Sequence, residues 1–469
     1  MRNFKIWTVS LSIVMVLSFL LAACGSKSAN DSSNSAGATA SPAASATAAP
    51  QQTEPVKIRL FTYGTENDYN WSQTIAAFEK AYPDIQVEVI TLSDKGDTQE
   101  SMKKLDLAAA SGEAMDVVMF SDPAGYAQHV GLGMVAPLDE FISKEGFNLT
   151  DEYKVDTHLN GKIYALPGKF NPWYVLLNKT MLDAKGLKVP TDWTWADFED
   201  YAAKLTSGSG ADKVYGTYFH GPQNGGWMEY LKLMMENQPQ NPEFLKADGS
   251  SNLADPNFQK TLELRQRMEK AGTVVPYTDV ISQKLAYRDE FYHQKAAMLV
   301  IGSWMNTMLG GNDQYPLNFE VAVAPFPKNN PGDQSGYTPV TTDYVAMAEV
   351  SKHKEEAYKF IRWYTTEGQI VQGKNVPSWN KVSAEDLSKI IDTILSGTAN
   401  PEKVDKASLV STLANSRAPE IIPPVTYQAE VYKAIDTEFQ KFILGKQDLA
   451  TTVKNCQEQT QKIIDSNKK

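Results

Sequence analysis

The chain of 469 residues carries 45 Lys and Arg against 56 Asp and Glu, a formal net charge of −11 at pH 7. Nucleic-acid binding depends on clustered basic residues, so this balance argues against a nucleic-acid partner. The part beyond residue 54, about 415 residues, is long enough for two domains.

The N-terminus has the pattern of an export signal. Arg2 and Lys5 precede an apolar run from Ile6 to about Ala23 that ends in small residues. The run is marginal in length for a membrane span, which needs roughly 20 apolar residues. We therefore expect residues 1–23 to be a signal peptide and the protein to act outside the cytoplasm.

The segment Leu21-Ala22-Ala23-Cys24 resembles the bacterial lipobox, in which the cysteine is lipidated and becomes the first residue of the mature chain. It predicts a lipid anchor on Cys24 that holds the protein at the bacterial cell membrane. The alternative is an ordinary secretory signal with an incidental cysteine. Residues 25–50 are rich in Ser, Ala and Thr and lack aromatic residues, so residues 24–54 are predicted to be the lipidated cysteine and a flexible linker.

The start of the folded part has an α/β pattern. Apolar residues alternate from Val56 to Leu60, a helical apolar face runs from Trp71 to Tyr82, and residues 85–89 alternate again. This β-α-β order predicts a parallel pair of strands, and the apolar run in MDVVMFSDP predicts a buried central strand. Ligands of such sheets bind beyond the C-terminal ends of the strands. Those ends carry Tyr63, Glu66, Asp68, Ser121 and Asp122.

The order of segments along the chain resembles the extracytoplasmic solute-binding proteins of ABC importers, in the group that includes maltose- and oligosaccharide-binding lipoproteins. The resemblance covers about residues 55–465. It is carried by the first β-α-β unit and by the segments DVVMFSDPAGYAQHVGLGMVAPLDEFI, GKIYALPGKFNPWYVLLNKTMLDAKGL, KAAMLVIGSW and SKHKEEAYKFIRWYTTEGQ. It implies an α/β fold, a two-lobed periplasmic-binding-protein-like clamshell of type II in which each lobe is a sheet flanked by helices.

The resemblance also implies where the lobes begin and end. Lobe 1 is expected to comprise residues 55–166 and 327–375, and lobe 2 residues 167–326 and 376–469. The chain is expected to pass between the lobes at three turns, near Leu166-Pro167, Ala324-Pro325 and Val376-Pro377.

The function that the resemblance implies is transport. A monomeric receptor without a cofactor is expected to bind a small carbohydrate, in particular an oligosaccharide, in the cleft between the lobes. It is then expected to deliver the sugar to the transmembrane subunits of an ABC permease.

Sugars present apolar C–H faces that aromatic rings cover, and hydroxyl groups that carboxylates, amides and Arg bind. A cleft with several aromatic residues and no excess of basic ones suits a neutral oligosaccharide, whereas an anion site favours Arg or helix N-termini. The resemblance gives Trp304 first place, because the family commonly has a stacking tryptophan at this position. The expected ligand contacts are Trp304, Trp227, Trp173, Asn171, Asp122, Tyr63, Glu66, Asp68, Asp343, Tyr344 and Trp379.

Alternatives remain open for several of these residues. Trp304 and Trp227 are also compatible with packing roles, and Asp122 with capping the helix that follows it. Trp379 follows the third expected passage, where relatives more often have a small residue, so it is either an addition to the site or a plug at the hinge.

The sequence predicts no enzyme activity. It contains no His-x-x-x-His, paired cysteines, Gly-x-Ser-x-Gly or phosphate loop, and its five histidines show no metal-ligand spacing. Two alternatives to a sugar receptor stay open. A secreted glycoside hydrolase needs two carboxyl groups roughly 5 to 9.5 Å apart, which 56 acidic residues do not exclude. A receptor for a peptide or a polyamine is the other.

Overall fold

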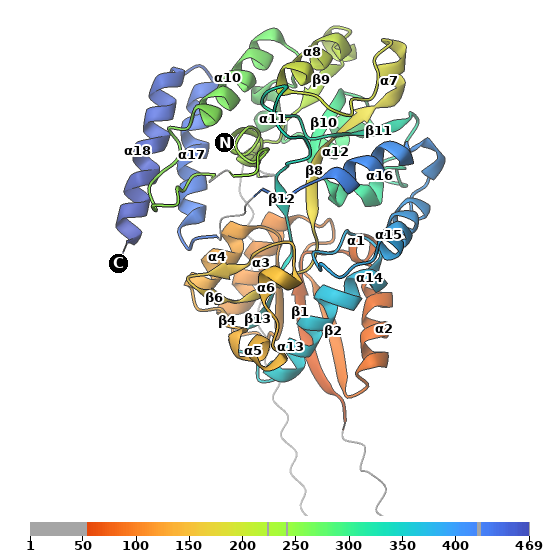
Figure 1. Ribbon diagram of the computed structural model, residues 1–469, viewed down its shortest axis with the longest axis vertical. Coiled ribbons are helices and arrows are strands. Elements are labelled where there is room, and N and C mark those ends of the chain that lie inside the picture. Colours follow the sequence, from red (N-terminus) through yellow and green to blue (C-terminus); the bar gives the residue numbers. More distant parts are fainter. Residues whose placement is uncertain (1–53, 223–224, 241–242, 420–423, 469) are drawn as a thin grey trace, which may run out of the picture. The chain divides into compact units, whose positions relative to one another are not determined.

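The computed structural model describes residues 54–222, 225–240, 243–419 and 424–468. The expected signal peptide, the lipidation site Cys24 and all of the linker except its last residue lie outside the described residues. The described part contains two larger β-sheets of mixed direction, each flanked by helices (Figure 1), and a small antiparallel sheet of β5 His158–Leu159 and β6 Lys162–Ile163. The expected α/β fold is confirmed.

The first sheet is built around the predicted β-α-β unit. The strand order is β2-β1-β3-β13-β4. Strand β1 pairs in parallel with both β2 and β3, and β13 pairs antiparallel with β3. A short strand, β7, also pairs with β13. The bounds are β1 Val56–Thr62, β2 Ile85–Thr91, β3 Val117–Phe120, β4 Val135–Ala136, β7 Ala165–Pro167 and β13 Tyr344–Ala348.

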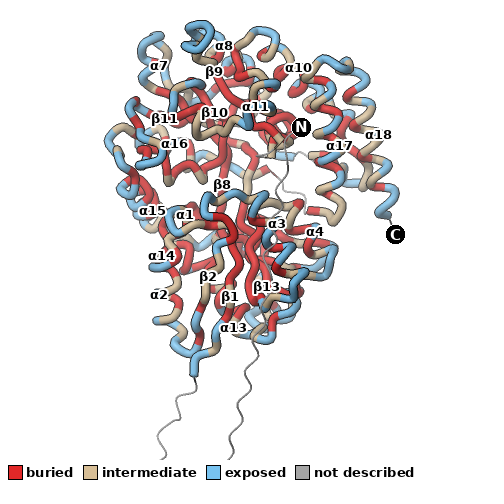
Figure 2. Tube along the Cα trace, turned by 180° about the vertical axis from the view of Figure 1, so that it is seen from behind, coloured by how far each residue is buried: buried red, intermediate tan, exposed pale blue. Residues whose placement is uncertain are grey.

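Helices cover both faces of this sheet because side chains of a strand alternate between its faces. Ile58 and Leu60 of β1 pack in one core cluster with residues of α2 and α13, while Phe61 packs in another with residues of α3 and α4. Figure 2 shows the buried strands between the more exposed outer helices. The helix bounds are α2 Trp71–Ala81, α3 Thr98–Ala110, α4 Pro123–Gly131 and α13 Lys354–Trp363.

The second sheet has the order β11-β8-β10-β9. Its central strand β8 pairs antiparallel with β10 and β11, and β10 pairs in parallel with β9. All eight residues of β8 are buried, which fits the apolar and aromatic residues between its two terminal asparagines. The bounds are β8 Asn171–Asn178, β9 Tyr215–Tyr218, β10 Ala296–Gly302, β11 Val321–Pro325 and β12 Val340–Thr341.

The helices of the second half also divide between the two faces of their sheet. Residues of α8 and α10 pack in one cluster with β8 and β10, and residues of α12, α15 and α16 pack in the other. A third cluster joins α10 to the C-terminal helices α17 and α18 and contains the buried Cys456. The bounds are α8 Trp195–Leu205, α10 Pro256–Ala271, α12 Tyr287–Tyr292, α15 Ala384–Ser396, α16 Lys406–Asn415, α17 Gln428–Ile443 and α18 Leu449–Asn467.

Three chain segments connect the two sheets, and the first of them is hydrogen bonded to each of the other two. The first joins β7 to β8, the second joins β12 to β13, and the third contains Val376. The Gly168 amide donates to the Asp343 carbonyl at 2.9 Å, and the Phe170 amide donates to the Val376 carbonyl at 2.7 Å. We call these three segments the links.

The second link lies later in the chain than the turn expected near Ala324-Pro325. Strand β12 still pairs with β8 of the second sheet, and Lys328 forms an ion pair with Asp192, which also belongs to that half. The chain therefore reaches the first sheet only after Thr341. The expected lobe boundaries stay a prediction. The strand pairing differs from them, because residues 327–341 were expected in lobe 1 and β12 pairs with the second sheet.

Candidate functional site

A cavity of about 560 Å³ lies between the two sheets. Its walls come from the loops that follow β1, β2 and β3, from the links, and from the second half of the protein. The loops after β1 and β3 were predicted to carry ligand contacts, because ligands of open α/β sheets bind beyond the C-terminal strand ends. The cavity is therefore the candidate functional site.

Eight of the eleven predicted contacts line this cavity. They come from both halves of the protein and include aromatic, amide and carboxylate side chains. They are Tyr63, Asp68, Asp122, Asn171, Trp173, Trp227, Trp304 and Tyr344. Whether each of them touches a ligand stays a prediction.

Two tryptophans form a corner in the wall. Trp173 and Trp304 meet edge to face, with their ring centroids 5.4 Å apart. Trp173 is almost fully buried, with 2% of its surface exposed, whereas Trp304 is only partly buried. Gly302 makes room for the Trp304 ring, because a Cβ at this glycine would lie 2.0 Å from the indole. The structure thus leaves Trp304 more accessible than Trp173 for stacking.

Asn171 and Trp173 lie two residues apart on β8 and therefore share one face of the strand. The Asn171 carboxamide oxygen accepts a hydrogen bond from Ser303 at 3.2 Å. The Asn171 Nδ2 and the Trp173 Nε1 are buried without a hydrogen-bond partner among the described residues. Buried donors of this kind usually have partners, so this face of β8 has unused capacity for hydrogen bonding.

Trp227 and Asp122 each have a packing role besides lining the cavity. Trp227 stacks on Tyr432 with centroids 3.8 Å apart, so one face of its ring is covered. Asp122 caps α4, because its Oδ1 accepts from the Gly125 amide at 2.8 Å. Burial raises the pKa of Asp122. The capping alternative for Asp122 is therefore realised, and its second oxygen accepts a hydrogen bond from the Ser121 hydroxyl at 3.4 Å.

Three predicted contacts do not line the cavity, and each has a local reason. Glu66 is exposed and accepts from the Ser72 amide at 3.0 Å. Asp343 is fully buried behind the wall, in an ion pair with Lys169. Trp379 packs against the core of the first half.

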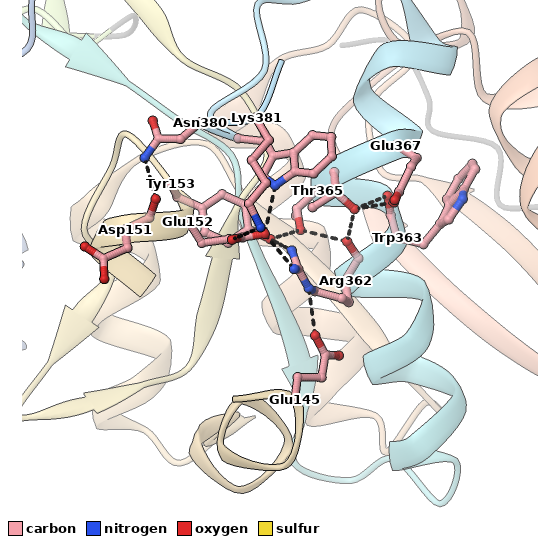
Figure 3. Close-up of polar contacts among 12 residues, drawn as sticks. Glu145, Asp151, Glu152, Tyr153, Arg362, Trp363, Thr365, Glu367, Asn380 and Lys381 are labelled. Atoms are coloured by element: carbon pink, nitrogen blue, oxygen red, sulfur yellow. Dashed lines mark hydrogen bonds and ion pairs between the residues drawn. The ribbon is translucent and has the colours of Figure 1, made fainter. Parts of the chain in front are cut away.

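Trp379 is held there by a carboxylate in the first half. Its indole donates to Glu152 at 2.9 Å, and the same carboxylate pairs with Arg362 at 2.7 Å and with Lys381 at 2.8 Å. Figure 3 shows Arg362 and Lys381 beside Glu152. The third link is thus attached to the first half of the protein. Trp379 does not line the cavity, and the ligand contact expected of it stays a prediction.

A lysine that sequence reasoning missed occupies the wall next to the links. Lys169 lines the cavity, and its ammonium contacts the Asp343 carboxylate at 2.9 Å, the Tyr69 hydroxyl at 2.6 Å and the Tyr63 hydroxyl at 3.1 Å. Burial is the main reason why the pKa values of Tyr63 and Tyr69 lie well above 10. All three ammonium donors are used, so Lys169 is committed to the protein rather than to a ligand.

Two further cavity residues were also missed, because nothing in their sequence context marks them. His220 is buried, and its Nδ1 is hydrogen bonded to the Glu229 carboxylate. Arg288 is half-buried in the first turn of α12, and this helix places it in the cavity wall beside Tyr287. Both positions depend on how the helices pack over the second sheet.

The described residues contain no cluster of His, Cys, Asp and Glu that could hold a metal ion. In the same part of the chain, no helix combines the length and the apolar character that a membrane crossing requires.

Two α/β halves joined by three links around a cavity define the two-lobed class of binding proteins. The family described as bacterial extracellular solute-binding protein matches residues 62–371, more than half of the chain, and the chain belongs to this family. The predicted family is therefore confirmed.

Individual relatives are more distant. The chain is 26% identical over 377 residues to the multiple sugar-binding protein of Streptococcus mutans, covering 76% of this chain and 77% of that protein. An ABC substrate-binding protein of Listeria monocytogenes, solved in complex with cycloalternan, has a TM-score of 0.70 at 22% identity and covers 88% of this chain and 100% of its own. Maltose-bound MalE3 of T. maritima has a TM-score of 0.64 at 20% identity, with 86% and 99% covered. These two structures confirm the two-lobed fold.

Proposed function

We propose that this protein binds a sugar, an oligosaccharide in particular, in the cavity between its lobes and delivers it to the permease of an ABC transporter. The observation that carries the proposal is the corner of Trp173 and Trp304 in the wall of a cavity of about 560 Å³. Aromatic faces cover the C–H surfaces of sugars by dispersion and apolar burial. The family and the names of the relatives support the same assignment.

Polar groups around this corner suit sugar hydroxyls. The unpartnered amide of Asn171 and the indole N–H of Trp173 can donate, and the Asp122 carboxylate can accept. An unsatisfied donor that is buried costs roughly 1 to 3 kcal/mol, which a ligand oxygen would offset. The cavity therefore offers both apolar stacking and hydrogen bonds, the two interactions that a sugar needs.

We further propose that the protein is monomeric, exported and anchored by a lipid on Cys24. This rests on the lipobox-like segment and on a family of extracellular proteins. Mass spectrometry of the membrane-extracted protein tests it: a lipid-modified Cys24 at the new N-terminus is expected. A mature chain that keeps residues before Cys24, or that carries an unmodified cysteine, contradicts the anchor and leaves sugar binding unaffected.

A glycoside hydrolase remains the competing assignment, because two acidic residues meet in the cavity wall. Glu236 and Glu243 both contact the Lys232 ammonium, at 2.7 and 3.7 Å. Burial raises the pKa of Glu243 to about 7, a value suited to a general acid. A hydrolase would cleave the bound sugar, whereas a receptor releases it unchanged.

A thermal-shift screen followed by mass spectrometry separates these assignments. A cognate oligosaccharide at 100 times its Kd should stabilise the protein by about 2.7 kcal/mol and raise its melting temperature. The sugar recovered after incubation should have its original mass. Stabilisation by peptides or polyamines but by no sugar would contradict the proposal, and so would a recovered sugar that has lost a glycosidic bond.

A further inference from the structure

One cation in the cavity wall has an unusual environment. Arg288, in α12, lines the cavity, and its guanidinium carbon lies 4.6 Å from the centroid of the Tyr287 ring. Its Nε donates to the Met308 sulfur at 3.1 Å. These two contacts orient the guanidinium plane and use one of its five N–H donors, on a weak acceptor.

The other buried cations of the wall are neutralised. Lys169 pairs with Asp343 at 2.9 Å, and Lys232 pairs with Glu236 at 2.7 Å. Lys95 also lines the cavity but is exposed to solvent. Arg288 is only partly exposed, and it makes no ion pair within the described residues. A cation removed from water is costly unless a charge or several acceptors compensate it.

The surroundings of Arg288 do not supply that charge directly. The neighbouring wall after β10 is formed by uncharged residues, including Thr307, Met308 and Gln314. Asp68, from the other half, acts on Arg288 electrostatically, but its carboxylate is hydrogen bonded to Thr65 at 3.0 Å rather than paired with the guanidinium. The edge that carries Nη1 and Nη2 is thus left without a protein partner in the described part.

We propose that this edge of Arg288 binds a carboxylate of the ligand, so that the transported solute is an acidic oligosaccharide bearing a uronic acid. The planar guanidinium offers two parallel donors that match the two oxygens of a carboxylate. The inference rests on the proposed sugar-binding function and deepens it. It also departs from the neutral oligosaccharide that the composition favoured, because composition does not show which cations lack a partner.

Paired ligands test the inference. Isothermal titration calorimetry compares neutral oligosaccharides of several linkages with the same oligosaccharides oxidised at one C6 to the uronic acid. The acidic member of a pair is expected to bind at least tenfold more tightly than its neutral partner. Sugar phosphates and sulfates of the same sugars form a third arm, since they also offer anionic oxygens; tighter binding of these than of the uronates overturns the assignment to a carboxylate.

Variants then assign the preference to Arg288. Arg288→Gln should reduce the ratio of acidic to neutral affinity to about one. Arg288→Lys keeps the positive charge but loses the two parallel donors, so it should give an intermediate ratio. The matched control is Arg267→Gln in the same half, at an exposed arginine that pairs with Glu199 and does not line the cavity. It should keep the wild-type ratio. Melting temperatures of all variants verify that they are folded.

Each other result has a defined meaning. If neutral sugars bind as tightly as their acidic partners, the inference is wrong and the sugar-binding function stands. If Arg288→Gln keeps the acidic preference, the role of Arg288 is wrong. If no member of any pair binds, the proposed function fails, and the inference fails with it.

Discussion

The Lys169 ammonium and the Asp343 carboxylate form an ion pair, 2.9 Å long, that connects the first link to the second. The backbone reinforces it, because the Gly168 amide donates to the Asp343 carbonyl and the Thr342 hydroxyl donates to the Lys169 carbonyl at 2.6 Å. Asp343 is fully buried and Lys169 nearly so. Since Lys169 also lines the cavity, the pair connects the candidate site with the segments about which the lobes would move.

Removing Lys169 should destabilise the protein strongly. Lys169→Met leaves the Asp343 carboxylate buried without its cation, which should lower the free energy of unfolding by about 3 to 5 kcal/mol in denaturant titrations. Lys57→Met is the matched control: Lys57 pairs with Glu88 at the surface, with side-chain exposures of 59% and 42%, and should cost at most about 1 kcal/mol. Equal losses in the two variants would show that the buried pair has no special role.

The double variant Lys169→Met with Asp343→Leu separates stability from hinge function. It removes both charges, so much of the stability should return. The links would nevertheless lack their ion pair, and the affinity for the cognate sugar should stay below that of the wild type. Full recovery of both stability and affinity would limit the pair to a packing role.

Trp304 should contribute directly to sugar binding. Trp304→Ala removes the accessible stacking ring and should weaken binding at least tenfold, about 1.4 kcal/mol in calorimetry. Gly302→Ala keeps the ring but places a Cβ within 2.0 Å of it, so the ring must shift and the affinity should also fall. Trp193→Phe, in the core of the same half, is the control and should lower the melting temperature without changing the affinity. Normal affinity in Trp304→Ala would remove this residue from the site.

Acid should weaken the attachment of the third link at Glu152. Burial alone would raise the pKa of Glu152, but hydrogen bonds from Lys381, Arg362 and Trp379 outweigh it and lower the pKa from 4.5 to about 2. A lowered carboxylate pKa stabilises the folded state above pH 4.5, and this contribution is lost as the pH falls toward 2.

The pH dependence can be measured with Glu152→Gln, which lacks the titrating group. The free energy of unfolding of the wild type should exceed that of the variant at pH 6, and the difference should shrink by roughly 2 kcal/mol by pH 2.5. Glu140→Gln, at an exposed residue, serves as the control and should show a difference that is small at both pH values. A difference for Glu152→Gln that is independent of pH would contradict the assigned ion pairs.

Local patterns were sufficient to predict much of the fold. The alternation of apolar residues in β1 and β2, the helical face of α2 and the buried run of β3 appear where the sequence predicted them. Cys456 on α18 is buried in the apolar cluster that this helix shares with α10 and α17. These features depend on residues close in the sequence, so periodicity reveals them.

The candidate site could be predicted only in part, because its remaining members depend on distant contacts. Tyr63 and Asp122 could be identified from their place at the ends of strands. The ion pair of Lys169 joins residues 174 positions apart, and the pairing of Trp379 with Glu152 spans 227. No local pattern shows such partners, which is why Asp343 and Trp379 were expected at the ligand and are found committed to the protein.

Small-angle X-ray scattering of the protein with and without its cognate oligosaccharide tests the central claim most directly. If the two lobes close around a sugar held in the cavity, a saturating sugar should reduce the radius of gyration, and Trp304→Ala should require a higher sugar concentration for the same change. An unchanged radius of gyration with sugar bound at saturation, confirmed by calorimetry on the same sample, would contradict closure of the lobes around the ligand.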